Sequence, residues 1–171
     1  VEDHGEAVLP PGSGPRHFCF HPNLPIVYCV TELDCALGTM AFDAEAGTLK
    51  AIASTSTLPS GGNDGASASA IAISRDGRHV YVGNRGHDSV ARFSTDPQTG
   101  IATFLGTTPS GGRIPRDFAF DPTGTILVVA NQESDCLTLF RYRSETGDLD
   151  PIEPAIAVGS PTVVAFHPHL R

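Results

Sequence analysis

The chain has 171 residues, of which 40% are hydrophobic and 18% are charged, a composition typical of one folded globular domain and not of a disordered chain. The formal net charge is −8 and Lys and Arg form no cluster, so we expect neither a nucleic-acid partner nor a membrane-surface partner. No apolar run approaches the roughly 20 residues of a membrane-spanning helix.

The first part of the chain predicts four short strands, at about 17–21, 26–31, 36–42 and 49–56. These runs are rich in Val, Ile, Phe and Thr, and turn residues separate them, for example the segment from Asp43 to Gly47 before the fourth strand. With 18 glycines and 14 prolines, the chain has little room for long helices. The segment therefore predicts a four-stranded antiparallel sheet.

The same pattern returns twice in full, and its first strand returns a third time. The sequence Arg-His-Phe-Cys-Phe-His-Pro begins at Arg16, and similar first-strand sequences begin at Ser69, Arg116 and Thr162. The third strand fits less well, and its aromatic residues align only after a two-residue shift. A repeat of roughly 45–50 residues with four strands is typical of a blade of a β-propeller.

The repeats predict one all-β domain, a partial β-propeller over residues 1–171. Its blades span about 12–58, 63–108 and 111–157, and residues 158–171 open a further blade with its first strand. Propellers usually close with about 4–8 blades, so three blades and one strand indicate part of a larger ring.

The first strand of each unit alternates large and small apolar residues. In the first unit Phe18 and Phe20 flank Cys19, and the other units repeat this alternation. A large face opposite a small face suits sheets that are stacked on both sides, so we expect both faces to be buried. At the two ends of a partial ring a blade face has no neighbour, and we expect such faces to favour self-association.

Two positions change their chemistry between repeats although their neighbours do not. The residue that opens the first strand is Arg16, Ser69 or Arg116, and the residue just after the second strand is Glu32, Arg85 or Gln132. In a propeller these ends converge on the central channel, where guanidinium groups would bind a phosphate or carboxylate and a carboxylate would activate water. Solvated loop charges or structural salt bridges are the alternative, and His17 is either a structural or a functional histidine.

Other chemistries find no support in the sequence. Nucleotide-binding glycine motifs, a nucleophile elbow and metal-binding histidine motifs are absent from the 171 residues, so we expect no metal and no cofactor. The four cysteines are too few and too irregularly spaced for a disulfide framework or for paired zinc ligands. They favour a reduced, cytoplasmic protein.

Three motifs resemble the lactonase family of seven-bladed β-propellers. They are Gly-Pro-Arg-His at 14–17, Glu-Leu at 32–33 and Asn-Arg at 84–85. The resemblance extends from about Gly12 to Pro168 and implies the C-terminal half of a seven-bladed ring, with a metal-free site in its channel. It assigns functional roles to Arg16, Glu32 and Arg85. A further functional histidine of the family belongs to a preceding blade, so we expect the site of this chain to be incomplete.

The resemblance implies hydrolysis of a sugar-acid lactone such as 6-phosphogluconolactone. Arg16 and Arg85 would hold the anionic group and polarise the ester carbonyl, and Glu32 would activate the attacking water. We expect His17, Arg116 and Gln132 to contact this small anionic substrate. Two alternatives remain open, a lactonising enzyme similar to carboxy-cis,cis-muconate cyclase and a propeller that binds a ligand without catalysis.

Overall fold

The computed structural model describes residues 5–59 and 65–167, and within these ranges it confirms an all-β partial propeller. Twelve strands form three four-stranded antiparallel sheets, each made of strands consecutive in sequence. They are β1 (Pro15–Phe20), β2 (Ile26–Thr31), β3 (Ala36–Asp43) and β4 (Thr48–Ser56); β5 (Ser67–Ile73), β6 (His79–Arg85), β7 (Ser89–Thr95) and β8 (Ala102–Pro109); and β9 (Pro115–Phe120), β10 (Ile126–Asn131), β11 (Cys136–Tyr142) and β12 (Leu149–Ala157). In these ranges one 3-10 turn, Gln132–Ser134, is the sole helical element, and no helix is long and apolar enough to cross a membrane.

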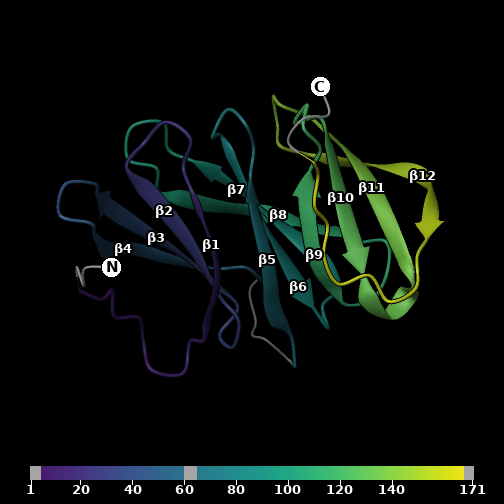
Figure 1. Ribbon diagram of the computed structural model, residues 1–171, viewed down its shortest axis with the longest axis horizontal. Coiled ribbons are helices and arrows are strands. Elements are labelled where there is room, and N and C mark those ends of the chain that lie inside the picture. Colours follow the sequence, from purple (N-terminus) through teal and green to yellow (C-terminus); the bar gives the residue numbers. More distant parts are fainter. Residues whose placement is uncertain (1–4, 60–64, 168–171) are drawn as a thin grey trace.

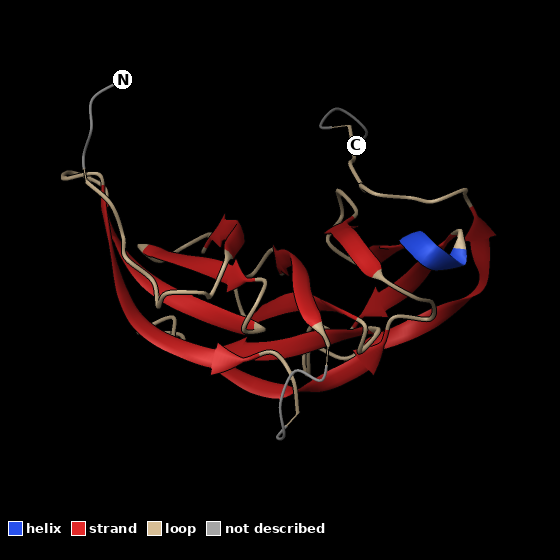
Figure 2. Ribbon diagram, turned by 90° about the horizontal axis from the view of Figure 1, so that it is seen from below, coloured by secondary structure: helices blue, strands red, loops and turns tan. Residues whose placement is uncertain are grey.

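The three sheets, called blades 1 to 3 below, follow one another along the chain (Figure 1) and lie around an arc that is open on one side (Figure 2). The first strands of neighbouring blades lie side by side. The Arg16 side chain of β1 reaches the backbone oxygen of Ser69 on β5, and the Ser69 hydroxyl donates to the backbone oxygen of Pro115 on β9 at 2.6 Å. These contacts bring the starts of β1, β5 and β9 together on the inner side of the arc.

Turn chemistry fixes the outer hairpins of blades 1 and 2. The carboxylate of Asp96 accepts hydrogen bonds from the backbone N–H groups of Gln98 and Thr99, at 3.0 and 2.7 Å, before the chain reverses at Gly100. Gly100 has φ +69°, a conformation that favours glycine. The Asp43 carboxylate makes the same kind of turn in blade 1.

A buried tyrosine of one blade binds this turn in the next blade. The Tyr28 hydroxyl donates to the backbone oxygen of Gly100 at 2.6 Å, and the Tyr81 hydroxyl donates to that of Gly147 at 2.6 Å. Both tyrosine side chains are fully buried in the cores between blades. The equivalent residue of blade 3 is Val128, which has no hydroxyl group.

The predicted two-residue shift in the third strand is wrong. The third strands of the three blades pair with the second strands at equivalent positions, which places all three blades in one register. The pairs are Val27 with Met40, Val80 with Phe93, and Leu127 with Phe140. Met40 occupies the position of the aromatic residues Phe93 and Phe140. The aromatic pattern alone therefore misplaced the strand, because a flexible apolar side chain replaces the ring in blade 1.

Blade 1 has the uncovered face that we expect at an end of a partial ring. Phe18 and Phe20 are 64% and 53% exposed, whereas the equivalent Phe118 of blade 3 is 3% exposed. No sheet covers this side of blade 1 in the described residues, and only Ala7 and Leu9 of the preceding segment pack against it.

The predicted first strand of a further blade does not form as a strand in the described residues. Residues 158–167 join no sheet, and the described residues hold no second strand with which they could pair. The segment is nevertheless attached to blade 3, where the backbone N–H of Val164 donates to the Asp117 carboxylate at 2.8 Å.

Candidate functional site

The loop after β2 holds Glu32 on the inner side of the arc. Its backbone N–H donates to the oxygen of Gly14 at 2.7 Å, and its backbone oxygen accepts from the N–H of Ala68 at 3.0 Å. Glu32 is thus fixed between the start of β1 and the start of β5. The two bonds span two blades, so the position of this residue depends on how the blades pack.

The structure brings Arg16, Glu32 and Arg85 into direct contact. One carboxylate oxygen of Glu32 lies 2.5 Å from Nη2 of Arg85, and the other lies 3.5 Å from Nε of Arg16. The side chains of the two arginines are 16% and 15% exposed, and that of Glu32 is 34% exposed. Two mostly buried cations therefore flank one carboxylate that still reaches solvent.

Backbone oxygens of β5 give both guanidinium groups a second anchor. Arg16 donates to the oxygen of Ser69 at 2.7 Å, and Arg85 donates to the oxygen of Ala68 at 3.2 Å. The Nε of Arg85 is buried and has no hydrogen-bond partner among residues 5–59 and 65–167. An unpartnered N–H on a buried cation is a donor that an anionic or carbonyl oxygen could satisfy.

The two arginines keep Glu32 ionised. A hydrogen bond from Arg85 is the main cause that lowers the pKa of Glu32, and the charges of Arg85, Arg16 and Arg116 lower it further against the opposing effect of burial. For Arg16, burial and the neighbouring charge of Arg85 lower the pKa. The site therefore combines a fixed carboxylate with cations that have lost much of their hydration.

His17 lies against the guanidinium group of Arg16. Both ring nitrogens are 3.3 Å from the same Arg16 nitrogen, which places the cation over the ring and not in line with one nitrogen. Burial, and then the charge of Arg16, lower the pKa of His17. Both effects favour the neutral imidazole over its cation, and in the neutral form one ring nitrogen is a donor and the other an acceptor.

Arg116 and Gln132 form a second pair in blade 3. Nη1 of Arg116 donates to the side-chain oxygen of Gln132 at 3.5 Å, a long hydrogen bond. Within the described ranges Arg116 has no ion pair, and it makes no hydrogen bond to the group of Arg16, Glu32 and Arg85. Its charge does act on both Arg16 and Glu32.

The sequence analysis missed Asp117, which sits at the repeat position of His17. Its charge acts on Arg16 and His17, and its carboxylate also binds the backbone of Val164. The equivalence of positions 17 and 117 in the repeat was the signal that could have found it. In the part of the chain that the structure describes, no group of three His, Cys, Asp or Glu side chains is placed to hold a metal ion.

Comparison with known proteins gives a consistent result. The family model described as "Lactonase, 7-bladed beta-propeller" matches residues 1–166. A 6-phosphogluconolactonase of Bacillus subtilis is 38% identical over 166 residues, which are 97% of this chain and 48% of that protein. A 6-phosphogluconolactonase of Pectobacterium carotovorum is 34% identical over 152 residues, 89% of this chain and 46% of that protein.

A solved structure is similar as well. The periplasmic gluconolactonase PpgL of Pseudomonas aeruginosa superimposes with a TM-score of 0.83 and 35% sequence identity. The match covers 90% of this chain and 42% of that protein. The chain thus spans about half the length of the relatives that it matches.

Proposed function

This chain belongs to the seven-bladed β-propeller lactonase family, and from that premise we propose that it forms part of a hydrolase that opens a sugar-acid lactone such as 6-phosphogluconolactone. One observation carries the proposal. Glu32 is held, ionised, between two mostly buried arginines, one of which has an N–H without a partner in the part of the chain that the structure describes. This arrangement suits a reaction in which negative charge develops on an ester carbonyl.

The proposed reaction needs groups that polarise a carbonyl and accept a proton. Arg16 and Arg85 bind the carbonyl oxygen or the anionic group and stabilise the oxyanion. Glu32 accepts a proton from a water molecule while the oxygen of that water attacks the carbonyl carbon. The ring C–O bond then breaks, and the leaving oxygen takes up the proton. The proposed reaction uses no metal and no cofactor.

The remaining contacts would orient the substrate. We assign this role to His17, whose neutral ring covers Arg16, and to Arg116 and Gln132 in blade 3. Arg116 lacks an ion-pair partner in the described ranges, so it can bind an anionic group without first breaking a salt bridge.

Two further proposals concern the whole protein. Because the chain spans about half of its relatives, we propose that further blades complete the site and that the chain alone is inactive. All four cysteines are free thiols, which favours the cytoplasm as the site of action.

The test is hydrolysis of 6-phosphogluconolactone above the spontaneous rate. It is run on this chain and on a complete ring, made by joining the chain to the part of the Bacillus subtilis relative that it does not match. In the complete ring we expect Glu32→Gln to lower turnover at least about 100-fold with little effect on substrate affinity. Glu45→Gln, which changes an exposed glutamate on the turn after β3, is the control.

The experiment distinguishes a lactonase, a cyclase and a binding propeller. Activity of the ring that depends on Glu32 and not on Glu45 supports the lactonase. A ring that leaves the lactone unchanged and instead lactonises a carboxymuconate favours the cyclase. If neither substrate reacts but sugar phosphates raise the melting temperature of the ring, the binding propeller is the better function.

A further inference from the structure

The outer strands of blades 2 and 3 differ at one position that faces the preceding blade. Phe104 on β8 pairs with Phe93, and Pro151 on β12 pairs with Phe140, so the two residues are equivalent. The Phe104 ring meets Phe93 edge-on, with centroids 5.6 Å apart, and packs into the core between blades 1 and 2. Between blades 2 and 3 the smaller Pro151 leaves this volume without an aromatic ring.

The outer rim of the two junctions differs in a second way. At the junction of blades 1 and 2, the hydroxyl of Thr55 donates to the backbone oxygen of Ala102 at 3.3 Å and ties β4 to β8. The equivalent residue of blade 2 is Thr108, which is paired with Val90 as Thr55 is with Leu37. In the described ranges Thr108 makes no such bond to β12, so the rim between blades 2 and 3 is not tied at this point.

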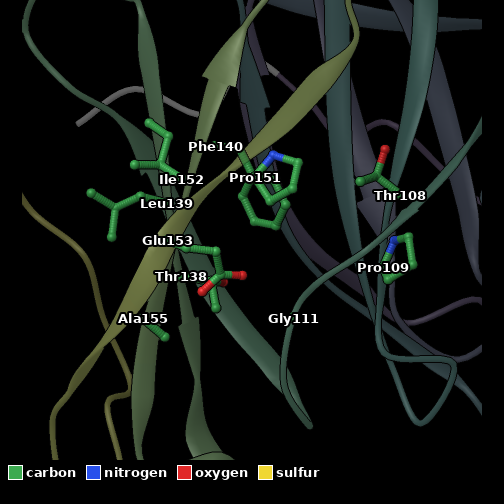
Figure 3. Close-up of a pocket in the computed structure, with 10 residues that line it drawn as sticks. All are labelled: Thr108, Pro109, Gly111, Thr138, Leu139, Phe140, Pro151, Ile152, Glu153 and Ala155. Atoms are coloured by element: carbon green, nitrogen blue, oxygen red, sulfur yellow. The ribbon is translucent and has the colours of Figure 1, made fainter.

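A groove of about 360 Å³ opens there (Figure 3). One wall comes from blade 3 and the other from the end of β8, where Thr108 and Pro109 face it across the gap. Its apolar residues are Pro109, Leu139, Phe140, Pro151, Ile152 and Ala155. Since an apolar cavity of about 150 Å³ can hold a benzene molecule, this groove has room for one aromatic ring.

Glu153 gives the groove its charge. Among the described residues it is the single charged residue of the lining, and it is exposed, with its carboxylate beside the apolar wall (Figure 3). In contrast, blade 2 carries Gly106 on the corresponding stretch of its outer strand. A carboxylate at the edge of an aromatic-sized groove favours a cationic group on the ring that enters it.

We propose that the groove between blades 2 and 3 binds an arylalkylammonium ion, a single aromatic ring that carries an ammonium group on a short chain. The ring occupies the volume that Phe104 fills at the other junction and contacts Phe140, and the ammonium group faces Glu153. This site is separate from the proposed lactone site, which lies at the starts of the inner strands, and it does not depend on that function.

The test is a titration of this chain with phenethylammonium, followed by backbone amide chemical shifts. We expect saturable shifts at Thr138, Leu139 and Ile152. Pro151→Phe gives blade 3 the aromatic ring that blade 2 has at Phe104, and it should abolish these shift changes. Ile156→Phe adds a ring to the same strand outside the groove lining and should leave binding unchanged. Thermal unfolding of both variants shows that they are folded.

The charge is tested with two ligands of similar size. Phenethylammonium should bind about threefold more tightly than phenylacetate, a small preference because an exposed ion pair contributes little to affinity. Glu153→Gln should remove this preference. Absence of saturable shifts in the groove, or unchanged binding in Pro151→Phe, would overturn the site. Equal affinity for the two ligands would overturn the assignment of an ammonium ion.

Discussion

Glu32 and Arg85 occupy the same position of two successive repeats, 53 residues apart, and they form an ion pair with each other. The pair exists because the two copies of this position have diverged to opposite charges. Neighbouring blades place equivalent positions side by side on the inner edge of the arc. If both repeats carried the same charged residue at this position, two like charges would lie side by side on the inner edge. Their repulsion would destabilise the contact between the two blades.

Removing this carboxylate should destabilise the chain. In Glu32→Gln the two arginines lose their shared counter-ion, and we expect a loss of about 1 kcal/mol in the free energy of unfolding at pH 7, since Glu32 is partly exposed. Denaturant unfolding measures the loss. Glu45→Gln on an exposed turn should change stability by less than about 0.5 kcal/mol. Equal losses in the two variants would contradict the assignment.

The stability difference between the wild type and Glu32→Gln should depend on pH. The pKa of Glu32 in the folded chain lies below its ordinary value of 4.5, chiefly because Arg85 donates a hydrogen bond to it. A carboxyl with a lowered pKa stabilises the fold above its unfolded pKa, and this contribution is lost as the pH falls through the folded value. We expect a constant difference between about pH 6 and 7 that shrinks below about pH 4.5. A difference that grows on acidification would exclude this mechanism.

The tyrosine contacts between blades predict additive losses. Tyr28→Phe and Tyr81→Phe keep the buried ring but leave the backbone oxygens of Gly100 and Gly147 without their hydroxyl donors. Each variant should lose about 1–2 kcal/mol, and the double variant should lose the sum, because the two sites share no partner. Thermal or denaturant unfolding measures both. Losses below about 0.3 kcal/mol would mean that water replaces the hydroxyl group.

The turn that receives Tyr28 should not tolerate a side chain. In Gly100→Ala the new Cβ would lie 2.8 Å from a side-chain carbon of Ile26, at a φ of +69° that is already unfavourable for alanine. We expect a loss of about 2–4 kcal/mol. Gly12→Ala is the matched control, because Gly12 also has a positive φ but no atom within 4 Å of the added Cβ. A loss of about 1 kcal/mol is expected there.

The uncovered face of blade 1 should make the chain associate with itself. Phe18 and Phe20 are mostly exposed on the side that packs against a neighbour in the other blades. We expect the mean mass in sedimentation experiments to rise with protein concentration, and Phe18→Ser with Phe20→Ser to reduce that rise. Ile101→Ser removes an exposed apolar side chain elsewhere, 40% exposed, and should have no such effect. A monomer at all concentrations would contradict the expectation.

Much of the fold follows from local sequence. The second strand was predicted at 26–31 and β2 spans Ile26–Thr31, because turn residues end each apolar run within one or two residues. The repeat also predicted which four strands form one sheet. It further indicated that the end blades have a face without a neighbour, but not that Phe18 lies on that face.

The candidate site was found through differences between repeats, and here the sequence had a limit. Asn84 and Asn131 lie beside the variable positions and are polar, yet both are fully buried and bind the connections between blades. Side chains at neighbouring strand positions point in opposite directions, and the pattern of polar residues does not distinguish them. The ion pairs of Glu32 required the distances between blades, which no single repeat contains.

Every sheet in the described part of the chain is built from four strands that are consecutive in sequence, so each blade can close through hairpins before it meets another. In the described residues the buried cores between blades join blade 1 to blade 2 and blade 2 to blade 3, so the packing is that of a one-dimensional array whose cooperativity comes from two junctions. Blade 2 has a neighbouring sheet on both sides, while blades 1 and 3 each have one. Amide hydrogens of β6 should therefore exchange slowest, and opening should begin at either end of the array and stop at the central sheet.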